Sequence, residues 1–495
     1  MKKYIVYVTI LFLLNSCSKF LDQQPHSLTS AAFWKTADQA EAALAGAYSP
    51  LQQEEALGGE EWACLEAFSD IGYVNDVGFP DYIAMTEFRA NQNVDGDMSL
   101  LGYQQYFQTI KRATDVLANV PNIEMDAAQK NRILGEANFL LAWGYFWEVH
   151  LYGGVPLYDP NNPASATVRA TAAQIWTVIE TSLTNATTQL QWSHDEGRPG
   201  LGAVYGLLAK VYAYESKWPE SKTAAEMVIN SGNHGLVPVY SNLWSMDHAV
   251  DNALENLWVL GGRINNGVLT STLYLPFNVW GGTHPEPSIG TGWRLVSATE
   301  NFYDSYEPQD NRRQATVAKR GVDVVSFGGF TDVIQIPENR SPVVCTKFMQ
   351  PYAGPTILYN PGMDIPVLRY ADVLLLDAEA IMNLNGGGPT NLTVPVAAAA
   401  APFNLVRVRA GLPAIAAPTF NDLMYERKME LAFEGGDRHF DLVRWGLAAA
   451  VYNIIPAEGS YKPARTFTAP KNNLLPYVQN EIDVSSGTIT QNPGY

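Results

Sequence analysis

The chain contains little cysteine. Its 495 residues include Cys17, Cys64 and Cys345, with no CxxC spacing, and the seven histidines are scattered. A structural zinc site needs about four Cys or His ligands at short spacings, so we expect neither a metal site nor a cofactor. Cys64 and Cys345 could pair in an oxidising compartment or remain two buried thiols, and the sequence leaves both possibilities open.

The chain also has fewer basic than acidic side chains. The chain has 32 Lys and Arg against 50 Asp and Glu, which gives a formal net charge of −18. Proteins that bind nucleic acid neutralise its phosphates with clustered Lys and Arg. The charge balance therefore argues against nucleic acid as a partner, and against polyanionic ligands in general.

Familiar catalytic motifs are missing. The sequence has no HExxH, no Gly-x-Ser-x-Gly and no P-loop. A glycosidase needs two carboxylates beside the scissile bond, but a chain with 50 acidic residues contains such pairs by chance. We therefore predict no catalytic residue and a protein that is not an enzyme, and we keep a hydrolase as an alternative.

The long apolar run is confined to the N-terminus. Residues 4–14 are largely apolar, follow Lys2 and Lys3, and lead to Cys17 behind Ser16. A basic start, a short apolar stretch and a small residue at the cleavage point are typical of a signal peptide. With Cys17 the segment resembles a bacterial lipoprotein signal, whose cysteine is acylated; an ordinary signal peptide is the alternative. No other segment reaches the roughly 18 apolar residues of a membrane span.

Most of the remaining sequence has a helical pattern. Apolar residues recur every three or four positions, which is the spacing of amphipathic helices, and Gly or Pro follows several of these segments. The expected helices are residues 38–47, 101–117, 130–150, 172–190, 202–217, 218–230, 368–384, 403–410, 421–434 and 438–451.

Two regions differ from the rest of the sequence in their residue pattern. The paired helices between residues 172 and 230, with a Trp218-Pro219 turn, look like degenerate tetratricopeptide-type hairpins. Between residues 232 and 366 the helical periodicity is lost, and Gly, Pro, Asn and Thr become frequent. A long irregular stretch of this kind inside a globular chain is usually functional.

Motifs of one family run from Cys17 to the C-terminus. They are residues 17–25 (CSKFLDQQP), 132–146 (RILGEANFLLAWGYF), 151–157 (LYGGVPL), 368–380 (LRYADVLLLDAEA), 403–413 (FNLVRVRAGLP), 426–446 (ERKMELAFEGGDRHFDLVRWG) and 490–495 (TQNPGY). Together they resemble the SusD/RagB family of surface nutrient-binding lipoproteins of Bacteroidetes. The set is specific, although no single segment is.

The resemblance implies a fold class and a domain organisation. We expect a mostly α protein in which tetratricopeptide-like helix hairpins form a right-handed scaffold, with a large irregular, loop-rich region carrying short strands. The expected parts are a signal peptide at 1–16, a lipidated tether at 17–25 and a single domain at 26–495, with the scaffold at about 26–231 and 367–451 and a ligand-facing insertion at about 232–366.

The resemblance also implies a function. We expect an outer-membrane lipoprotein, anchored by lipid at Cys17 and exposed at the cell surface. It would bind oligo- or polysaccharides without turnover and deliver them to a TonB-dependent, SusC-like outer-membrane transporter. Two further alternatives stay open: a peptide-binding import lipoprotein, and a helical-repeat scaffold of a surface complex.

Loops outside the helices are the expected ligand site. The resemblance implies a glycan site on one face, and residues 60–97 and 263–294 qualify. Aromatic rings stack on the apolar faces of sugars, and nearby amides, carboxylates and Arg fix the orientation. Trp280 leads because a ring beside Gly281-Gly282 has little core to pack into. The predicted ligand-binding residues are Trp280, Trp62, Trp293, Tyr73, Asn75, Asp76, Tyr82, Arg89 and His284.

Other residues are predicted to be structural. Tryptophans on expected helices should be core; these are Trp143, Trp147, Trp176 and Trp445. Charges of both signs recur in residues 426–446, at Arg427, Glu430, Glu434, Arg438, Asp441 and Arg444. They could be catalytic carboxylates with an arginine clamp, but charges three or four positions apart commonly link helices. We predict an ion-pair network that joins two helices and caps Gly435-Gly436.

Overall fold

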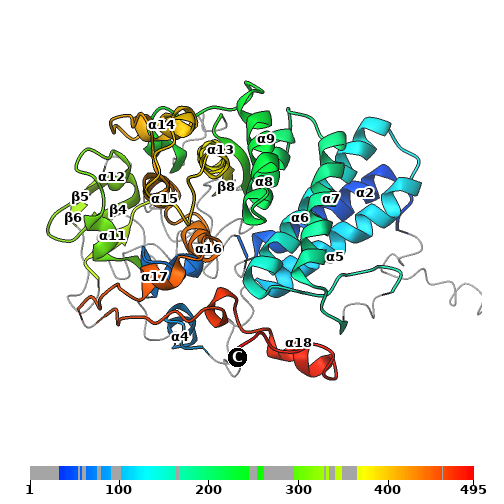
Figure 1. The fold of residues 1–495 in the computed structure, drawn as a ribbon. Helices are drawn as coiled ribbons and strands as arrows, with labels where there is room; N and C mark the ends of the chain where they lie inside the picture. Colours follow the sequence, from blue (N-terminus) through cyan, green and yellow to red (C-terminus); the bar gives the residue numbers. More distant parts are fainter. Residues whose placement is uncertain are drawn as a thin grey trace, which may run out of the picture.

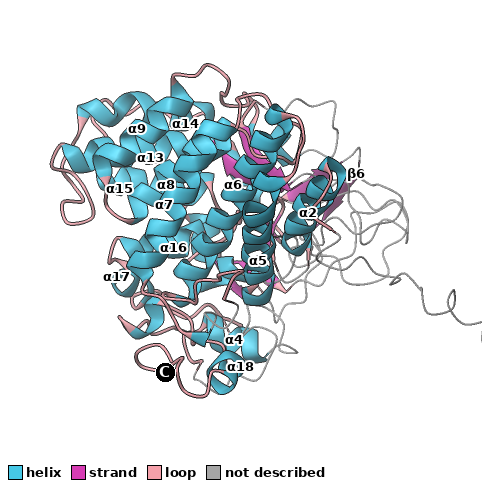
Figure 2. Ribbon diagram, turned by 90° about the vertical axis from the view of Figure 1, so that its right-hand side faces the viewer, coloured by secondary structure: helices cyan, strands magenta, loops and turns pink. Residues whose placement is uncertain are grey.

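The computed structural model describes most of the chain after residue 32. The described residues are 33–53, 56–57, 63–74, 80–90, 102–162, 167–244, 254–260, 295–327, 330–333, 341–347, 365–459 and 461–495. Helices make up most of this part and the strands are short, as Figure 1 and Figure 2 show. No helix among these residues is long and apolar enough to cross a membrane.

The helices confirm most of the predicted segments. They are α2 (Ala37–Tyr48), α4 (Pro80–Thr86), α5 (Tyr103–Asn119), α6 (Ala127–Tyr152), α7 (Ala172–Gln189), α8 (Leu201–Tyr214), α9 (Trp218–Ile229), α11 (Glu300–Asp304), α12 (Arg312–Thr316), α13 (Tyr370–Leu384), α14 (Ala400–Arg409), α15 (Phe420–Glu430), α16 (Asp437–Arg444), α17 (Ala448–Tyr452) and α18 (Gln479–Val484). Short 3-10 turns include η2 (Leu65–Phe68) and η8 (Lys471–Asn473).

Successive helices pack as hairpins. α5, α6 and α7 contact one another in turn, and α8 and α9 pack together against α13. Capping boxes begin α2 and α7, where Thr36 and Thr171 bond with Gln39 and Gln174. The predicted fold class, helix hairpins with an irregular region of short strands, is confirmed.

α6 is the central helix, buried along most of its length. A helix that is apolar on every side is expected inside the protein. Trp143 and Trp147 on α6 are buried, as is Trp445, which confirms the prediction for these three. Trp176 on α7 is partly buried, so the prediction of a core position is only half right there.

Several predicted helix boundaries are wrong, and three of them show a change of structure at that point. Leu368 and Arg369 belong to a strand, and α13 begins at Tyr370. α15 ends at Glu430, four residues early. The expected helix 438–451 is two helices, because Gly446 adopts a φ of +71° and turns the chain between α16 and α17.

Close backbone packing explains the Gly-Gly pair after α6. Gly153 has a φ of +75°, a conformation that favours glycine. A Cβ on Gly154 would lie 2.2 Å from the carbonyl oxygen of Ala170. Arg169 donates hydrogen bonds to the carbonyl oxygens of Gly154 (2.6 Å) and Thr490 (2.8 Å). This arginine therefore fastens the C-terminal segment to the end of α6.

Four two-stranded antiparallel sheets lie among the described residues. They are β1 (Gly72–Val74) with β3 (Val296–Ala298), β2 (Asn256–Leu260) with β8 (Ile365–Arg369), β4 (Val317–Lys319) with β7 (Val343–Cys345), and β5 (Val324–Phe327) with β6 (Phe330–Val333). Cys64 and Cys345 are both buried thiols, which decides between the two possibilities for this pair.

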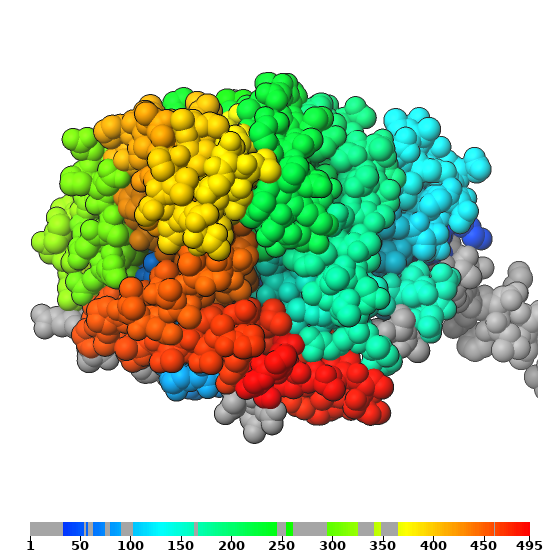
Figure 3. Space-filling model, viewed as in Figure 1, coloured from blue at the N-terminus to red at the C-terminus, as the bar shows by residue number. Residues whose placement is uncertain are grey.

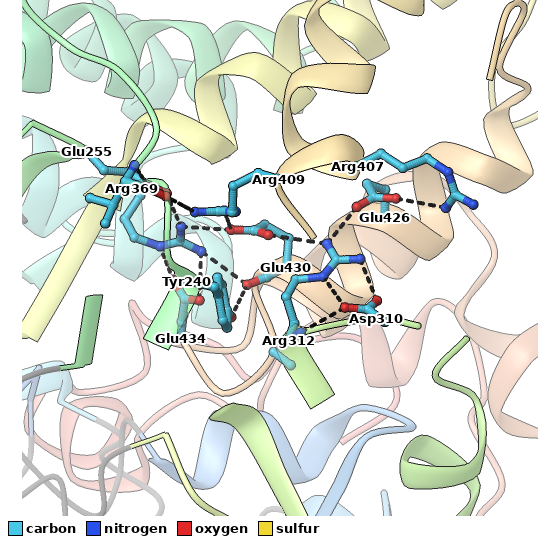
Figure 4. A network of polar contacts seen from close by, with 12 residues as sticks. Tyr240, Glu255, Asp310, Arg312, Arg369, Arg407, Arg409, Glu426, Glu430 and Glu434 are labelled. Carbon is cyan, nitrogen blue, oxygen red and sulfur yellow. Dashed lines mark hydrogen bonds and ion pairs between the residues drawn. The ribbon is translucent and has the colours of Figure 1, made fainter. Parts of the chain in front are cut away.

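A buried ion-pair network joins α15 to segments far away in the sequence (Figure 4). Glu430, the last residue of α15, accepts hydrogen bonds from Arg312 (3.2 Å), Arg369 (2.9 Å) and Arg409 (2.5 Å). Arg369 also donates to Glu434 at 2.6 Å. Burial alone would raise the pKa of Glu430, but the three guanidinium groups hold it below its ordinary value.

A second cluster of buried charges links α13, α15 and α16. Arg427 donates to Asp372 and Asp441, both at 2.7 Å. Arg444 donates to Asp441 (2.9 Å) and Glu379 (2.6 Å). Of these four pairs, only Arg444 with Asp441 has the helical spacing that the sequence suggested. The predicted network is confirmed, but it joins more than two helices and most of its pairs are long-range.

The cap of Gly435-Gly436 comes from outside the charged block. Glu66 in η2 accepts hydrogen bonds from the backbone N–H groups of Gly435 (2.8 Å) and Gly436 (2.7 Å). Gly436 has a φ of +81°, and a Cβ there would lie 2.8 Å from the Cβ of Leu65. Burial raises the pKa of Glu66 to about 7, although both backbone hydrogen bonds favour the carboxylate.

Replacing Arg369 by Met should lower the free energy of unfolding by about 3–5 kcal/mol, because buried carboxylates lose their shared cation. Urea denaturation followed by circular dichroism measures the loss. Lys222→Met is the matched control, since Lys222 pairs with Glu226 on the exposed face of α9 and such pairs contribute about 0.5 kcal/mol or less. Equal losses in the two variants would contradict the central role of Arg369.

Glu66 makes stability depend on pH. Its pKa is 4.5 in the unfolded chain and about 7 in the folded protein, so the folded state binds more protons between these values. The free energy of unfolding should therefore fall as pH rises from 4.5 to 7, by about 3 kcal/mol for this group. Glu66→Gln keeps the acceptor oxygen but cannot titrate, so this part of the slope should disappear. Urea curves at several pH values test this, and an unchanged slope in Glu66→Gln would refute it.

Candidate ligand-binding face

The two predicted ligand segments leave the scaffold at one place. β1 and β3 are antiparallel, with Gly72 opposite Ala298 and Val74 opposite Val296. In such a pair the end of one strand lies beside the start of the other. Val74 directly precedes Asn75 in the chain, and β3 begins two residues after position 294. The ladder therefore places the exit from β1 beside the entry to β3.

Tyr73 lies within this ladder. Its side chain is 5% exposed, and its hydroxyl accepts a hydrogen bond from the backbone N–H of Ser341 at 2.9 Å. Burial raises the pKa of Tyr73 to about 12, so the hydroxyl stays protonated. The ring packs against Tyr461 with centroids 5.7 Å apart. Tyr73 thus supports the ladder from inside, and its direct contact with a ligand stays a prediction.

Tyr82 and Arg89 lie on the segment that follows the first loop. Tyr82, on α4, is buried. Arg89 is the accessible one of these two, with a side chain 62% exposed that pairs with Glu87 at 2.5 Å. Phe88, between them in the chain, has a φ of +59° and packs edge-on against Phe467, so the end of this segment is held by the C-terminal region.

The remaining predicted positions lie outside the described residues, and their roles stay predictions. They are the six ligand candidates Trp280, Trp62, Trp293, Asn75, Asp76 and His284, and the lipidation site Cys17.

Tyr461 is a ligand candidate that the sequence analysis missed. Its ring is half-buried and leans on Gly459, where a Cβ would lie 2.7 Å from a ring carbon. Its hydroxyl donates a hydrogen bond to Glu300 at 2.5 Å. The signal was present in the sequence, because an aromatic residue near a loop glycine is the pattern that selected Trp280.

Glu300 begins a partly exposed strip of polar side chains along α11. The hydroxyl of Tyr461 and the ammonium of Lys319, 3.0 Å away, lower the pKa of Glu300, which is therefore ionised. Tyr303, three residues later, is buried and donates to Asp323 at 2.6 Å. Burial and that carboxylate raise the pKa of Tyr303 to about 12.

The strip combines a half-buried ring with charges that compensate one another. Such a surface suits an uncharged ligand that offers an apolar face and several hydroxyl groups, since the ring supplies contact area and the polar groups fix orientation. Among the described residues, no group of three or more His, Cys, Asp and Glu side chains is arranged to hold a metal ion.

Two family profiles match the sequence. One, described as the SusD family, matches residues 261–495, and one described as "Starch-binding associating with outer membrane" matches residues 19–213. SusD-like protein P2 of Formosa agariphila is 24% identical over 100% of both chains. A SusD-like protein of Bacteroides ovatus is 25% identical over 90% of this chain and 82% of its own.

Solved structures share the fold. A laminarin-binding SusD-like protein superposes with a TM-score of 0.78 at 25% identity, over 93% of this chain and 100% of its own. Surface glycan-binding protein A of Bacteroides thetaiotaomicron, in complex with laminarihexaose, superposes with a TM-score of 0.77 at 22% identity, over 92% and 100%. The two profiles cover residues 19–213 and 261–495, and the relatives match along the same length, so these findings together support a SusD-like family protein.

Proposed function

We propose that this protein binds neutral oligo- or polysaccharides at the outer membrane and hands them to a TonB-dependent, SusC-like transporter. Its family is described as associating with the outer membrane. The proposal also includes a lipid anchor at Cys17, exposure at the cell surface, and binding without turnover. A signal of the lipoprotein type at residues 1–17 supports the anchor.

The pairing of β1 with β3 is the main observation that supports the proposed ligand site. It places the exit from β1 into the first loop segment beside the return of the second segment into β3, although about 220 residues separate the two strands in sequence. Tyr461 and Glu300 stand beside the same ladder, through the contact of Tyr461 with Tyr73. Tyr73, Tyr461 and Glu300 thus lie together beside the base of both loop segments, which supports a site for a hydroxylated ring there.

Charge favours a neutral ligand. The chain carries a net charge of −18, so a polyanion would be repelled at long range. A neutral glycan avoids this repulsion, and its binding should depend little on ionic strength because ring contacts and short hydrogen bonds are screened very little.

The first test is affinity electrophoresis of residues 18–495 through gels that carry laminarin, starch or other neutral polysaccharides. Laminarin is included because one solved relative is named for binding it. At least one polymer should retard the protein, equally at low and high salt. No retardation by any polymer, with a correctly folded protein, would remove glycan binding from the proposal.

Aromatic variants then locate the site. Tyr461→Ala and Trp280→Ala should each weaken retention about tenfold, because each removes one stacking ring and a factor of ten corresponds to about 1.4 kcal/mol. Trp192→Ala is the control, since Trp192 packs on Tyr205 at the connection between α7 and α8. Wild-type retention in both test variants would place the site elsewhere.

A further inference from the structure

A pocket of about 330 Å³ opens on the helical scaffold, where α6, α7, α8 and α16 meet the C-terminal segment. In Figure 3 the orange part of the chain, which includes α16, adjoins the teal part and the red C-terminal segment near the centre of the face it draws. None of the residues that line the pocket belongs to β1, β3, α11 or the loop of Tyr461. The lining includes Val149, His150, Trp176, Tyr214, Phe440 and Asn473.

Helix ends make this pocket aromatic. His150 lies in the last turn of α6, Trp176 in the second turn of α7, and Tyr214 is the last residue of α8. The centroid of the His150 ring lies 4.2 Å from that of Tyr214, 5.3 Å from that of Trp176 and 5.4 Å from that of Phe440, each in an edge-to-face arrangement. The Trp176 indole is half-buried, so part of it faces the opening.

Several polar groups in the pocket are left without a partner. Nδ1 of His150 faces the carbonyl oxygen of Phe146 at 2.5 Å and so carries the proton, while Nε2 is buried and has no hydrogen-bond partner in the described part of the chain. The Tyr214 hydroxyl, the Trp176 indole N–H and the Asn473 side-chain amide likewise bond to none of the described residues. A buried unpaired group such as Nε2 of His150 costs stability and requires an explanation, while the other three groups are accessible to water and to a ligand.

The pocket carries no net charge that would select an ion. Arg444 on its wall is bonded to Glu379 and Asp441, which compensate its charge. Burial lowers the pKa of His150 to about 3, so its ring is neutral at physiological pH. The occupant that matches these walls is an uncharged ring with an apolar face and hydroxyl groups around its edge.

We propose that this pocket is a second carbohydrate site, which takes a single pyranose ring stacked on Trp176 with its hydroxyls directed to Tyr214 and Asn473. The inference deepens the proposed function, because it supposes that the protein handles glycans. The volume of about 330 Å³ accommodates one hexose and leaves an open side through which a longer chain can continue.

Saturation-transfer difference NMR on the mature protein tests this site with D-glucose, D-galactose and D-mannose as probes. The protein is held in a polyoxyethylene detergent, which contains no sugar. At least one hexose should receive saturation from the wild-type protein. In Trp176→Ala the transfer should fall at least fivefold, while retention in polysaccharide gels should weaken but persist, because the first site stays intact. Trp192→Ala should leave both measurements unchanged.

Tyr214→Phe keeps the aromatic wall and removes only the hydroxyl, so it tests the site even if Trp176→Ala folds poorly. It should reduce the transfer at least threefold with an unchanged melting temperature. Polysaccharide retention together with undiminished transfer in both variants would overturn the second site and leave the proposed function standing. Neither retention nor transfer in the wild type would overturn both.

Discussion

The buried salt bridges around Arg369 and Glu430 are the constraint on which the rest of this structure depends. Arg369 ends β8, Arg312 begins α12, Arg409 ends α14 and Glu430 ends α15, so the contacts lock together segments that local helix or strand formation cannot place. The desolvation free energy of burying charged side chains offsets much of their Coulombic attraction. We therefore infer that the network contributes mainly by allowing one docking arrangement, in which every carboxylate meets a guanidinium.

That arrangement also determines where the irregular region attaches. Glu255, directly before β2, accepts a hydrogen bond from Arg369 at 2.6 Å, while Glu66 next to β1 holds the turn at Gly435-Gly436. The strands that carry the candidate ligand loops are thus tied to the same charged core as the helices. A binding site formed by loops needs such rigid supports, because a shift of the strand from which a loop extends shifts every residue of that loop.

The family resemblance supplied the class of fold, and sequence periodicity was enough to predict most helices, since apolar spacing and caps are local signals. It was not enough to predict the partners of the charged block: Arg312 meets Glu426 across 114 residues, and no local pattern announces such a pair. The same limit applies to the site. Tyr73 was chosen as an aromatic residue in an expected loop, yet it lies in the ladder with β3, which buries it, and it packs against Tyr461 from a segment far along the chain.

Trp176 is an exception among the tryptophans that the sequence placed in the core. A tryptophan on an amphipathic helix is usually core, but Trp176 lies near the start of α7, where neighbouring helices end and leave one side of the ring uncovered. Two sites that each hold one or two sugar rings bind single sugars weakly. A polymer that reaches both dissociates far more slowly, because the second contact forms at high effective concentration. A protein tethered beside a transporter would thereby retain long glycans and release short ones.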